Sequence, residues 1–359
     1  MWFNSIHYVV FLFCVCILLW SFKKREYQHS LLLIASYYFY FSSSGFLLFL
    51  IIYSSLLDFY CGKEIYEASG QERKKFFLIL SLVGNLGMLC LFKYADFLIY
   101  HFNYLSEFFG FSPLPFFYLA LPVGISFYTF QTLSYTIDIY RGELKPTNSF
   151  GQFALYVAFF PQLVAGPIVR AADFLPQLNK KISVTYKNFK FGLTLIGFGM
   201  TKKVVFADNI ATFVNSIFSD PTKYGSLIII LATIGFGVQI YCDFSAYTDI
   251  AVGSAKILGF HFKKNFNKPY FARNPSDFWK RWHISLSSWL KDYLYIPLGG
   301  NRKGKARMYV NLMITMVLGG LWHGASLNFV IWGGSRVYYC SSTDFFLTYL
   351  NLGYLQLFQ

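Results

Sequence analysis

Residues 308–335 read MYVNLMITMVLGGLWHGASLNFVIWGGS and contain no Asp, Glu, Lys or Arg. A membrane-spanning helix needs about 20 predominantly apolar residues, so this run is long enough to cross a bilayer. Its one histidine, His323, lies in the motif Gly319-Gly320-Leu321-Trp322-His323-Gly324. An imidazole at membrane depth is costly unless it has a partner or a function, and His323 is therefore the first candidate for a functional residue.

Apolar runs recur along the chain, which has 359 residues, of which 55% are hydrophobic, 22% aromatic and only 13% charged. An ordinary soluble domain has about 25% charged residues. Uncharged runs occur at 1–22, 27–57, 108–137, 146–169 and 224–242; the run 76–92 is slightly short, and 191–219 is interrupted only by Lys202, Lys203 and Asp208. We therefore predict an all-α, polytopic membrane protein with roughly eight to ten crossings, some of them broken or re-entrant.

The net charge of +14 comes largely from basic residues that stand between the apolar runs, as in Lys23-Lys24-Arg25 and Arg73-Lys74-Lys75. Basic loops mark the cytoplasmic side of a membrane protein, so the run 1–22 followed by Lys23 predicts a retained first span with the N-terminus outside. The basic residues form no single patch with interleaved aromatic residues, which argues against nucleic-acid binding. We expect a multi-pass protein of the cytoplasmic membrane.

Helix breakers stand inside two of the apolar runs, at Pro122-Val123-Gly124 and at Pro161 with Gly166-Pro167. Broken backbone at membrane depth is tolerated only where it is buried in protein or lines a cavity. These breaks predict an internal, partly aqueous chamber. The alternative is an ordinary proline kink at each site.

Residues 277–295 differ from the apolar runs because charged residues at both ends bracket an aromatic face. The spacing of one helix face is followed by Trp279, Trp282, Leu286, Trp289 and Tyr293. We predict one amphipathic helix that is re-entrant or interfacial, with its tryptophans at the headgroup level. His283 lies on this helix, offset from the tryptophans, and is either functional or a hydrogen-bonded packing residue.

The glycines beside His323 form a second unusual feature of the 308–335 run. Gly319, Gly320 and Gly324 permit close approach by another backbone or by a substrate. The alternative is tight helix packing through small residues, which needs no substrate.

A polar cluster at the end of the 224–242 run contains Asp243, Ser245 and Asp249. Its two carboxylates would orient an imidazole or line a chamber in a functional interpretation. In the alternative they pair with Lys or Arg of a neighbouring loop.

Several catalytic motifs are absent from the sequence. There is no G-x-x-x-x-G-K-[ST] loop for nucleotide phosphates, no H-E-x-x-H for zinc and no G-x-S-x-G nucleophile elbow. The six cysteines form no C-x-x-C pair, so we expect them in core packing and expect no bound metal. A lone histidine acting as general base on a hydroxyl is the simplest chemistry that remains.

Ordered motifs along the chain carry a family resemblance. They read LPVGISFYTFQ at 121–131, SYTIDIYR at 134–141, FPQLVAGPIVR at 160–170, YCDFSAYTD at 241–249, DFWKRWHISLS at 277–287 and GGLWHG at 319–324. In order and residue type they resemble the membrane-bound O-acyltransferases, in particular the branch that acetylates alginate and transfers D-alanine to teichoic acids. The agreement runs from the N-terminus to about Gly334.

The resemblance implies a ring of tilted helices around a central tunnel, with a thioester donor and a hydroxyl acceptor approaching from opposite faces. It implies transfer of an acetyl or similar short acyl group to surface polysaccharide or to an extracytoplasmic acyltransferase partner. The family's catalytic histidine falls on His323 and its second motif histidine on His283. The expected donor is acetyl-CoA or an acyl-thioester carrier, with no tightly bound cofactor. Candidates for tunnel lining or orienting groups are Asp243, Ser245, Asp249, Trp322 and Arg170.

After Gly334 the sequence departs from the family's pattern. We assign 1–334 to the acyltransferase domain and 335–359 to an atypical C-terminal tail, as in a truncated or frame-shifted product that would be inactive if the helix ring stayed open. A transporter or channel, in which the broken helices and His323 serve a permeation path, is the alternative from a different class.

Overall fold

The computed structural model describes residues 1, 3–163, 166–180, 182 and 184–337. All regular elements in these ranges are helices, which confirms the predicted all-α class. The chain divides into two compact units, the first made of Met1–Leu78 and Gln131–Lys263, the second of Ile79–Phe130 and the chain from Lys264 onward. The ring of helices and its tunnel stay a prediction.

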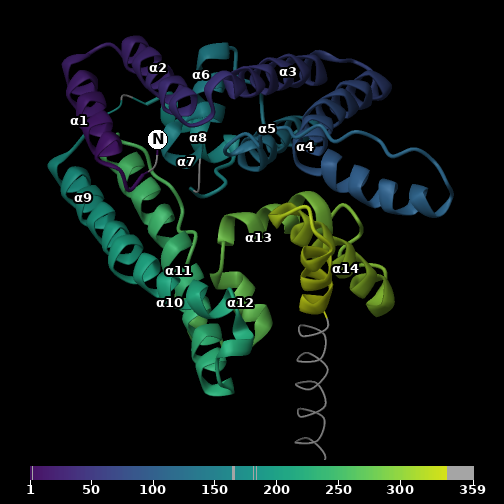
Figure 1. Cartoon of the computed structure of the whole chain (residues 1–359). Helices are drawn as coiled ribbons and strands as arrows, with labels where there is room; N and C mark the ends of the chain where they lie inside the picture. Colours follow the sequence, from purple (N-terminus) through teal and green to yellow (C-terminus); the bar gives the residue numbers. More distant parts are fainter. Residues whose placement is uncertain (2, 164–165, 181, 183, 338–359) are drawn as a thin grey trace, which may run out of the picture. The chain divides into compact units, whose positions relative to one another are not determined.

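The first unit holds most of the helices. Their bounds are α1 Ile6–Ser21, α2 Arg25–Ser44, η1 Gly45–Leu47, α3 Leu48–Glu67, α6 Phe150–Ala158, α7 Phe160–Leu163, α8 Ala171–Leu178, α9 Tyr186–Thr201, η2 Lys202–Ala207, α10 Asp208–Phe218, η3 Pro221–Lys223 and α11 Ser226–Ile257. Within it, α6 packs against α2 and α3 (Figure 1).

The second unit contains the remaining elements. Their bounds are η4 Pro269–Phe271, α12 Pro275–Arg281, α13 Ile284–Leu290, the π-helical turn η5 Lys291–Tyr295, α14 Gly304–His323 and a helical segment 327–337. Two helices, α4 Gln71–Phe108 and α5 Ile125–Tyr140, begin in one unit and end in the other. Residues 335–337 continue the last helical segment, and the rest of the predicted tail, 338–359, lies outside the described residues.

Three helical stretches of the described chain are long and apolar enough to cross a membrane, Arg25–Glu67, Gln71–Phe108 and Ser226–Ile257. This is fewer than the predicted eight to ten, because several uncharged runs are not single helices. The run 108–137 is non-helical between residues 111 and 124, and the run 146–169 is divided into α6 and α7. An apolar run thus sets an upper limit on crossings, since it does not reveal where the backbone turns.

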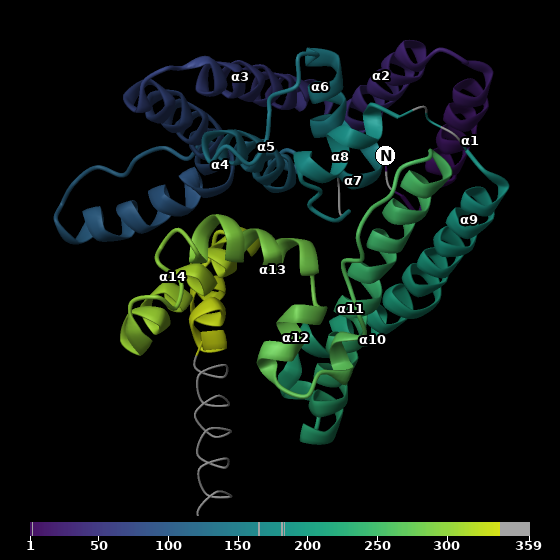
Figure 2. The ribbon, with the colours of Figure 1, turned by 180° about the vertical axis from the view of Figure 1, so that it is seen from behind.

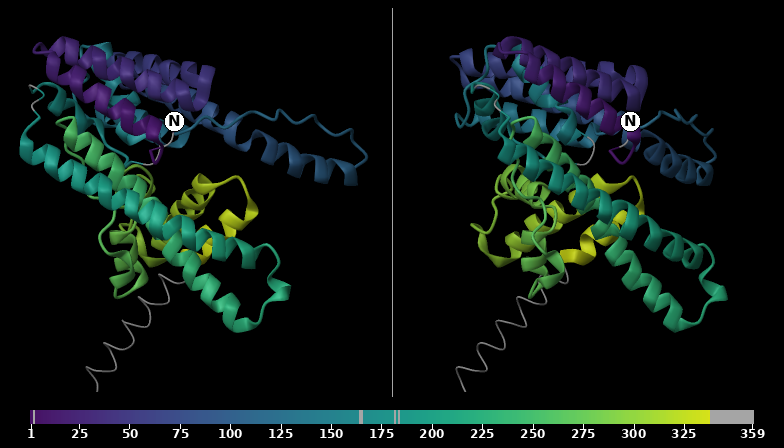
Figure 3. Two further views of the ribbon diagram at one scale, coloured as in Figure 1. Left: turned by 60° about the vertical axis from the view of Figure 1, so that its left-hand side comes forward. Right: turned by 90° about the vertical axis from the view of Figure 1, so that its left-hand side faces the viewer.

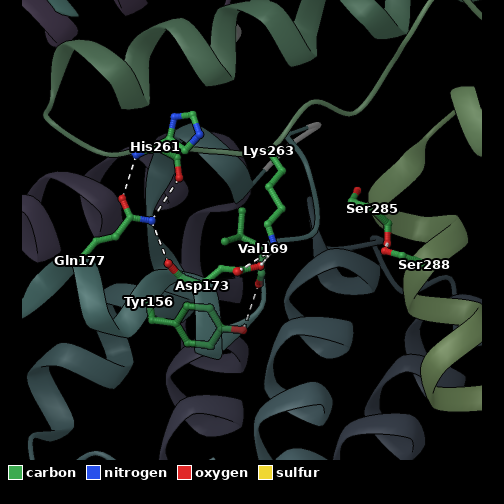
Figure 4. A network of polar contacts seen from close by, with 8 residues as sticks. All are labelled: Tyr156, Val169, Asp173, Gln177, His261, Lys263, Ser285 and Ser288. Atoms are coloured by element: carbon green, nitrogen blue, oxygen red, sulfur yellow. Dashed lines mark hydrogen bonds and ion pairs between the residues drawn. The ribbon is translucent and has the colours of Figure 1, made fainter.

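The divided run 146–169 confirms that the predicted backbone breaks are real, and a tyrosine lies at its centre. Tyr156 is fully buried, and its hydroxyl lies 3.0 Å from the carbonyl oxygen of Gln131 and 3.1 Å from that of Val169 (Figure 4). The Val169 carbonyl, in the non-helical segment before α8, thus lies next to a buried donor, as apolar surroundings require. The aqueous chamber that these breaks suggested stays a prediction.

Glycines permit a close helix contact in the first unit, between α9 and α11, which run side by side (Figure 3). A Cβ added to Gly192 would lie 2.6 Å from the Gly253 carbonyl oxygen, and one added to Gly253 would lie 2.7 Å from the Gly192 carbonyl oxygen. Only glycine permits this approach, as in other helix pairs packed through small residues.

We expect Gly253→Leu to lower the thermal unfolding midpoint of the protein in detergent, because overpacking such a contact costs about 1–3 kcal/mol. Gly197→Leu is the matched control, since a Cβ at Gly197 on α9 meets nothing within 4 Å. Equal midpoints for the two variants would contradict the close α9–α11 contact.

Candidate active site

Both candidate histidines line one cavity of the second unit, with a volume of about 510 Å³. Its walls come from α12, α13, η5, α14 and Arg336; η5 follows α13 directly and packs against α14 (Figure 2 shows these helices). The structure thus brings together His283 and His323, which are 40 positions apart in the chain. The apolar part of the wall is formed by Trp279, Trp282, Leu286, Leu290, Leu312 and Met316.

Trp322 connects the two imidazoles. Its ring centroid lies 6.0 Å from that of His283 and 5.0 Å from that of His323, both in edge-on geometry. The Trp322 ring also stacks with the Phe130 ring, with a centroid distance of 5.9 Å. The Phe130 ring in turn stacks on the Trp289 ring, with a centroid distance of 3.8 Å. Trp289 Nε1 also donates to the Phe130 carbonyl oxygen at 2.9 Å. Rings from α5, α13 and α14 therefore form one continuous aromatic wall.

The two histidines differ in burial. His283 is only 2% exposed, whereas the His323 side chain is exposed within the described chain. The His323 ring is surrounded by Trp322, Phe329 and Trp332, with centroids 5.0, 6.3 and 5.1 Å away, and makes no hydrogen bond to the described residues. Its orientation thus depends on ring packing and leaves its nitrogens available to a molecule in the cavity.

The predicted single helix over 277–295 is wrong. It is divided into α12, α13 and η5, and the division between α12 and α13 falls at His283, whose φ of +43° is left-handed. This conformation costs a non-glycine residue free energy, and it persists only when the surrounding structure fixes it. Helical periodicity did not reveal the break, because the aromatic spacing continues across it.

Before this break, α12 begins with a well-defined cap. The Asn274 side chain accepts a hydrogen bond from Asp277 N at 2.8 Å, and Pro275 follows at the first helical position. The Arg281 guanidinium donates to Asp277 Oδ1 at 2.9 Å and holds the pKa of this carboxyl below its usual range. The cap and the ion pair give this short helix a defined start and end.

The C-terminal end of α14, which carries His323, is held by two side chains of α4 that the sequence analysis missed. Tyr94 Oη donates to the Leu321 carbonyl oxygen at 2.7 Å, and Lys93 Nζ donates to the Trp322 carbonyl oxygen. The ammonium group also lies 5.7 Å from the centroid of the Trp322 ring. A cation at this end satisfies carbonyls that the helix leaves unpaired and complements its dipole. The available signal was a lone lysine directly after the apolar run 76–92, which an intramembrane-charge criterion would have selected.

The glycines beside His323 pack against protein. A Cβ on Gly320 would collide with the Phe329 carbonyl oxygen, one on Gly324 with the Phe329 ring, and one on Gly319 would lie 3.2 Å from the Leu290 side chain. Gly333 makes the reciprocal approach to the Met316 carbonyl oxygen. The packing interpretation is therefore confirmed for Gly320 and Gly324, whereas Gly319 also lines the cavity.

The remaining predicted site residues belong to the first unit, apart from the Trp322 already described. Lys203 Nζ lies 2.6 Å from Asp243 Oδ1, and Lys202 pairs with Asp249 and donates to Ser245 Oγ at 3.0 Å. Both lysines belong to the π-helical turn η2. The alternative in which the carboxylates pair with basic residues is thus confirmed.

Arg170 is the N-cap residue of α8. On the same helix, Asp173 pairs with Lys263 at 2.7 Å, and Gln177 exchanges two hydrogen bonds with the backbone of His261 (Figure 4). These contacts attach α8 to the segment after α11. Among the described residues, no group of three or more His, Cys, Asp or Glu side chains is arranged to hold a metal ion.

Fold and site together define a helical membrane protein with a paired-histidine cavity lined by aromatic rings. The sequence matches the model of the membrane-bound O-acyltransferase family over residues 143–352, more than half of the chain, and the chain belongs to this family.

Three relatives illustrate the range of the family. The chain is 42% identical over 282 residues to the probable alginate O-acetylase AlgI of Pseudomonas aeruginosa, covering 78% of this chain and 54% of that protein. It is 37% identical over 309 residues to the peptidoglycan O-acetyltransferase of Helicobacter pylori, covering 79% and 58%. It is 30% identical over 220 residues to the teichoic acid D-alanyltransferase of Bacillus subtilis, covering 59% and 56%. The chain spans about half the length of the curated relatives it matches.

Replacing Lys93 by Met should loosen the last turn of α14, because a hydrogen bond to a charged group contributes about 1.5–3 kcal/mol. We expect amide hydrogen exchange over residues 319–323 to become about tenfold faster or more. Lys75→Met, at an exposed position near the start of the same helix, is the control. Unchanged exchange in the Lys93 variant would show that this contact does not fix the helix end.

Proposed function

We propose that the chain is an O-acyltransferase that moves a short acyl group, most simply acetyl, from a thioester donor to a hydroxyl acceptor. The observation that carries the proposal is the cavity of the second unit, which His283 and His323 both line, with the Trp322 ring edge-on to each imidazole. Family membership favours this function over that of a transporter.

The chemistry requires one base and no covalent enzyme intermediate. Neutral His323 accepts the proton of the acceptor hydroxyl while that oxygen attacks the thioester carbonyl carbon. The C–S bond then breaks, the new ester leaves, and the departing thiolate takes up the proton from His323 to become a thiol. General base catalysis contributes about 10²- to 10⁴-fold, so positioning of both substrates in the cavity has to supply much of the rest.

Cations beside the histidines support an anionic donor. Lys280, Lys291 and Arg336 line the cavity, and no Asp or Glu is among the described residues that do so. The Arg336 guanidinium carbon lies 4.0 Å from the centroid of Trp279 and 3.1 Å from that of Trp332, which fixes its place in the wall. Phosphate groups of coenzyme A or of a carrier's phosphopantetheine arm are donor groups that these cations would bind.

The acceptor and the location follow from the family and the charge pattern. Relatives are named for acetylation of alginate and of peptidoglycan, so a cell-surface polysaccharide is the proposed acceptor, directly or through an extracytoplasmic acyltransferase partner. Basic loops between apolar runs support the cytoplasmic membrane as its location. A donor from the cytoplasm would thus reach an acceptor on the other side.

Replacing His323 by Ala should lower acyl transfer by about 10²- to 10⁴-fold, because the proton acceptor is lost. The measurement is ester-linked acetyl on surface polysaccharide of cells that lack the native gene and express the chain. His101→Ala is the matched control, since His101 contacts the Phe97 carbonyl oxygen on α4 and does not line the cavity. Acetylation that survives in the His323 variant, or that falls equally in the control, would contradict the assignment.

Replacing Arg336 by Met should raise the KM for the acyl donor about tenfold or more and leave kcat less affected, because a charged hydrogen bond to phosphate contributes about 1.5–3 kcal/mol. Arg302→Met is the control, at an exposed position in the loop before α14. The measurement is transfer of labelled acetyl from acetyl-CoA by the purified protein. An unchanged KM would argue against a donor-binding role for Arg336.

A further inference from the structure

Asn265 is a buried residue that no motif in the sequence selects, and it contacts the His283 turn through both its backbone and its side chain. It lies in the segment between α11 and η4 and is 1% exposed. Its carbonyl oxygen accepts from Ile284 N at 2.8 Å, and two residues later Asn267 N donates to the Arg281 carbonyl oxygen at 2.9 Å. The segment that contains Asn265 and Asn267 thus runs beside the turn at residues 281–284, which contains His283.

The side-chain oxygen of Asn265 is the centre of a small hydrogen-bond cluster. Oδ1 accepts from Ser285 N at 3.1 Å and from Ser285 Oγ at 2.8 Å, and His283 Nδ1 lies 3.3 Å away from it. An amide side chain can be turned the wrong way round, but a backbone N–H is always a donor. The atom facing Ser285 N is therefore the oxygen of Asn265 and not its nitrogen.

This assignment fixes the proton on His283. An amide oxygen has no hydrogen to donate, so a favourable contact with it requires that Nδ1 carries the hydrogen. The Ser285 hydroxyl, 3.4 Å from Nδ1, gives its own hydrogen to Asn265 and turns a lone pair toward the ring. Asn265 Oδ1 and Ser285 Oγ thus both act as acceptors toward Nδ1, and in the neutral ring Nε2 then holds the lone pair.

Asn265 also supports the backbone conformation of His283. His283 has a left-handed φ of +43°, a conformation that costs about 1–3 kcal/mol and persists only where the surroundings fix it. The hydrogen bonds from Ile284 N and Ser285 N to Asn265 supply that support. One residue therefore holds the turn and selects the tautomer.

We propose that Asn265 is a positioning residue that keeps His283 in its Nδ1–H tautomer, so that His283 meets the substrate as an acceptor at Nε2. This inference rests on the proposed function for its catalytic consequence. Neutral His283 then accepts a hydrogen bond from a hydroxyl or N–H group of a substrate and does not donate one to the thioester oxygen. A sugar acceptor, which carries several hydroxyls, fits such a site.

The test is the tautomer itself, read from long-range ¹H–¹⁵N correlation spectra of the full chain labelled with ¹⁵N-histidine in detergent. The His283 signals are assigned by their absence in His283→Gln. We expect a protonated Nδ1 and an unprotonated Nε2 in the intact protein, and again a protonated Nδ1 in Asn265→Asp, which keeps an acceptor oxygen. Asn265 Nδ2 has no hydrogen-bond partner among the described residues, so the exchange to Asp removes no contact there. Asn265→Leu should lose the pattern.

Asn267→Leu is the matched control, because this exposed side chain lies in the same segment, and its spectrum should equal that of the intact protein. In acyl transfer, Asn265→Leu should lower kcat by about 10- to 100-fold with a smaller change in KM, and Asn265→Asp should restore much of it. An Nε2–H tautomer in the intact chain, or an unchanged tautomer in Asn265→Leu, would overturn the inference. Absent transfer with the expected spectrum would count against the proposed function and leave the positioning role standing.

Discussion

Backbone polar groups that leave a helix inside an apolar environment must find a partner within the protein, and this constraint shapes both units of the chain. In the first unit the Val169 carbonyl, in the non-helical segment before α8, lies next to the buried hydroxyl of Tyr156. In the second, the end of α14 is contacted by Lys93 and Tyr94, and the turn at His283 by Asn265. Each of these interruptions thus comes with a side chain that hydrogen-bonds to the backbone.

The two candidate catalytic residues stand at two of these interruptions. His323 is the last residue of α14, and His283 is the left-handed residue between α12 and α13. A side chain in the middle of a regular helix is flanked by neighbours one turn above and below, whereas a side chain at a helix end has one side open. Helix ends therefore allow two imidazoles to reach one cavity, and the supporting groups on α4 and at Asn265 make those ends rigid. Strain held at such positions is a recurring property of active sites.

The sequence predicted the elements that depend on composition and spacing, and it failed where the contact partner is distant in the chain. The apolar runs correctly indicated an all-α membrane protein, and the isolated imidazole of His323 pointed to the cavity. Periodicity also made 277–295 look like one helix, because aromatic spacing continues through the break at His283. Asn265 and Lys93 were missed since each acts through a contact far away in sequence, and only Lys93 carried a signal, as a charge beside an apolar run. The partners of Asp243 and Asp249 were foreseen by type, because carboxylates in apolar surroundings require cations.

Charge is distributed differently in the two units, and the difference bears on the proposed donor. In the first unit the carboxylates Asp243 and Asp249 are paired with Lys203 and Lys202, and this polar cluster joins η2 to α11. In the second, the described cavity wall holds cations and imidazoles without a carboxylate. An anionic donor is held best by cations that no carboxylate competes for. The absence of carboxylates from the described cavity wall therefore favours the anionic donor that we propose.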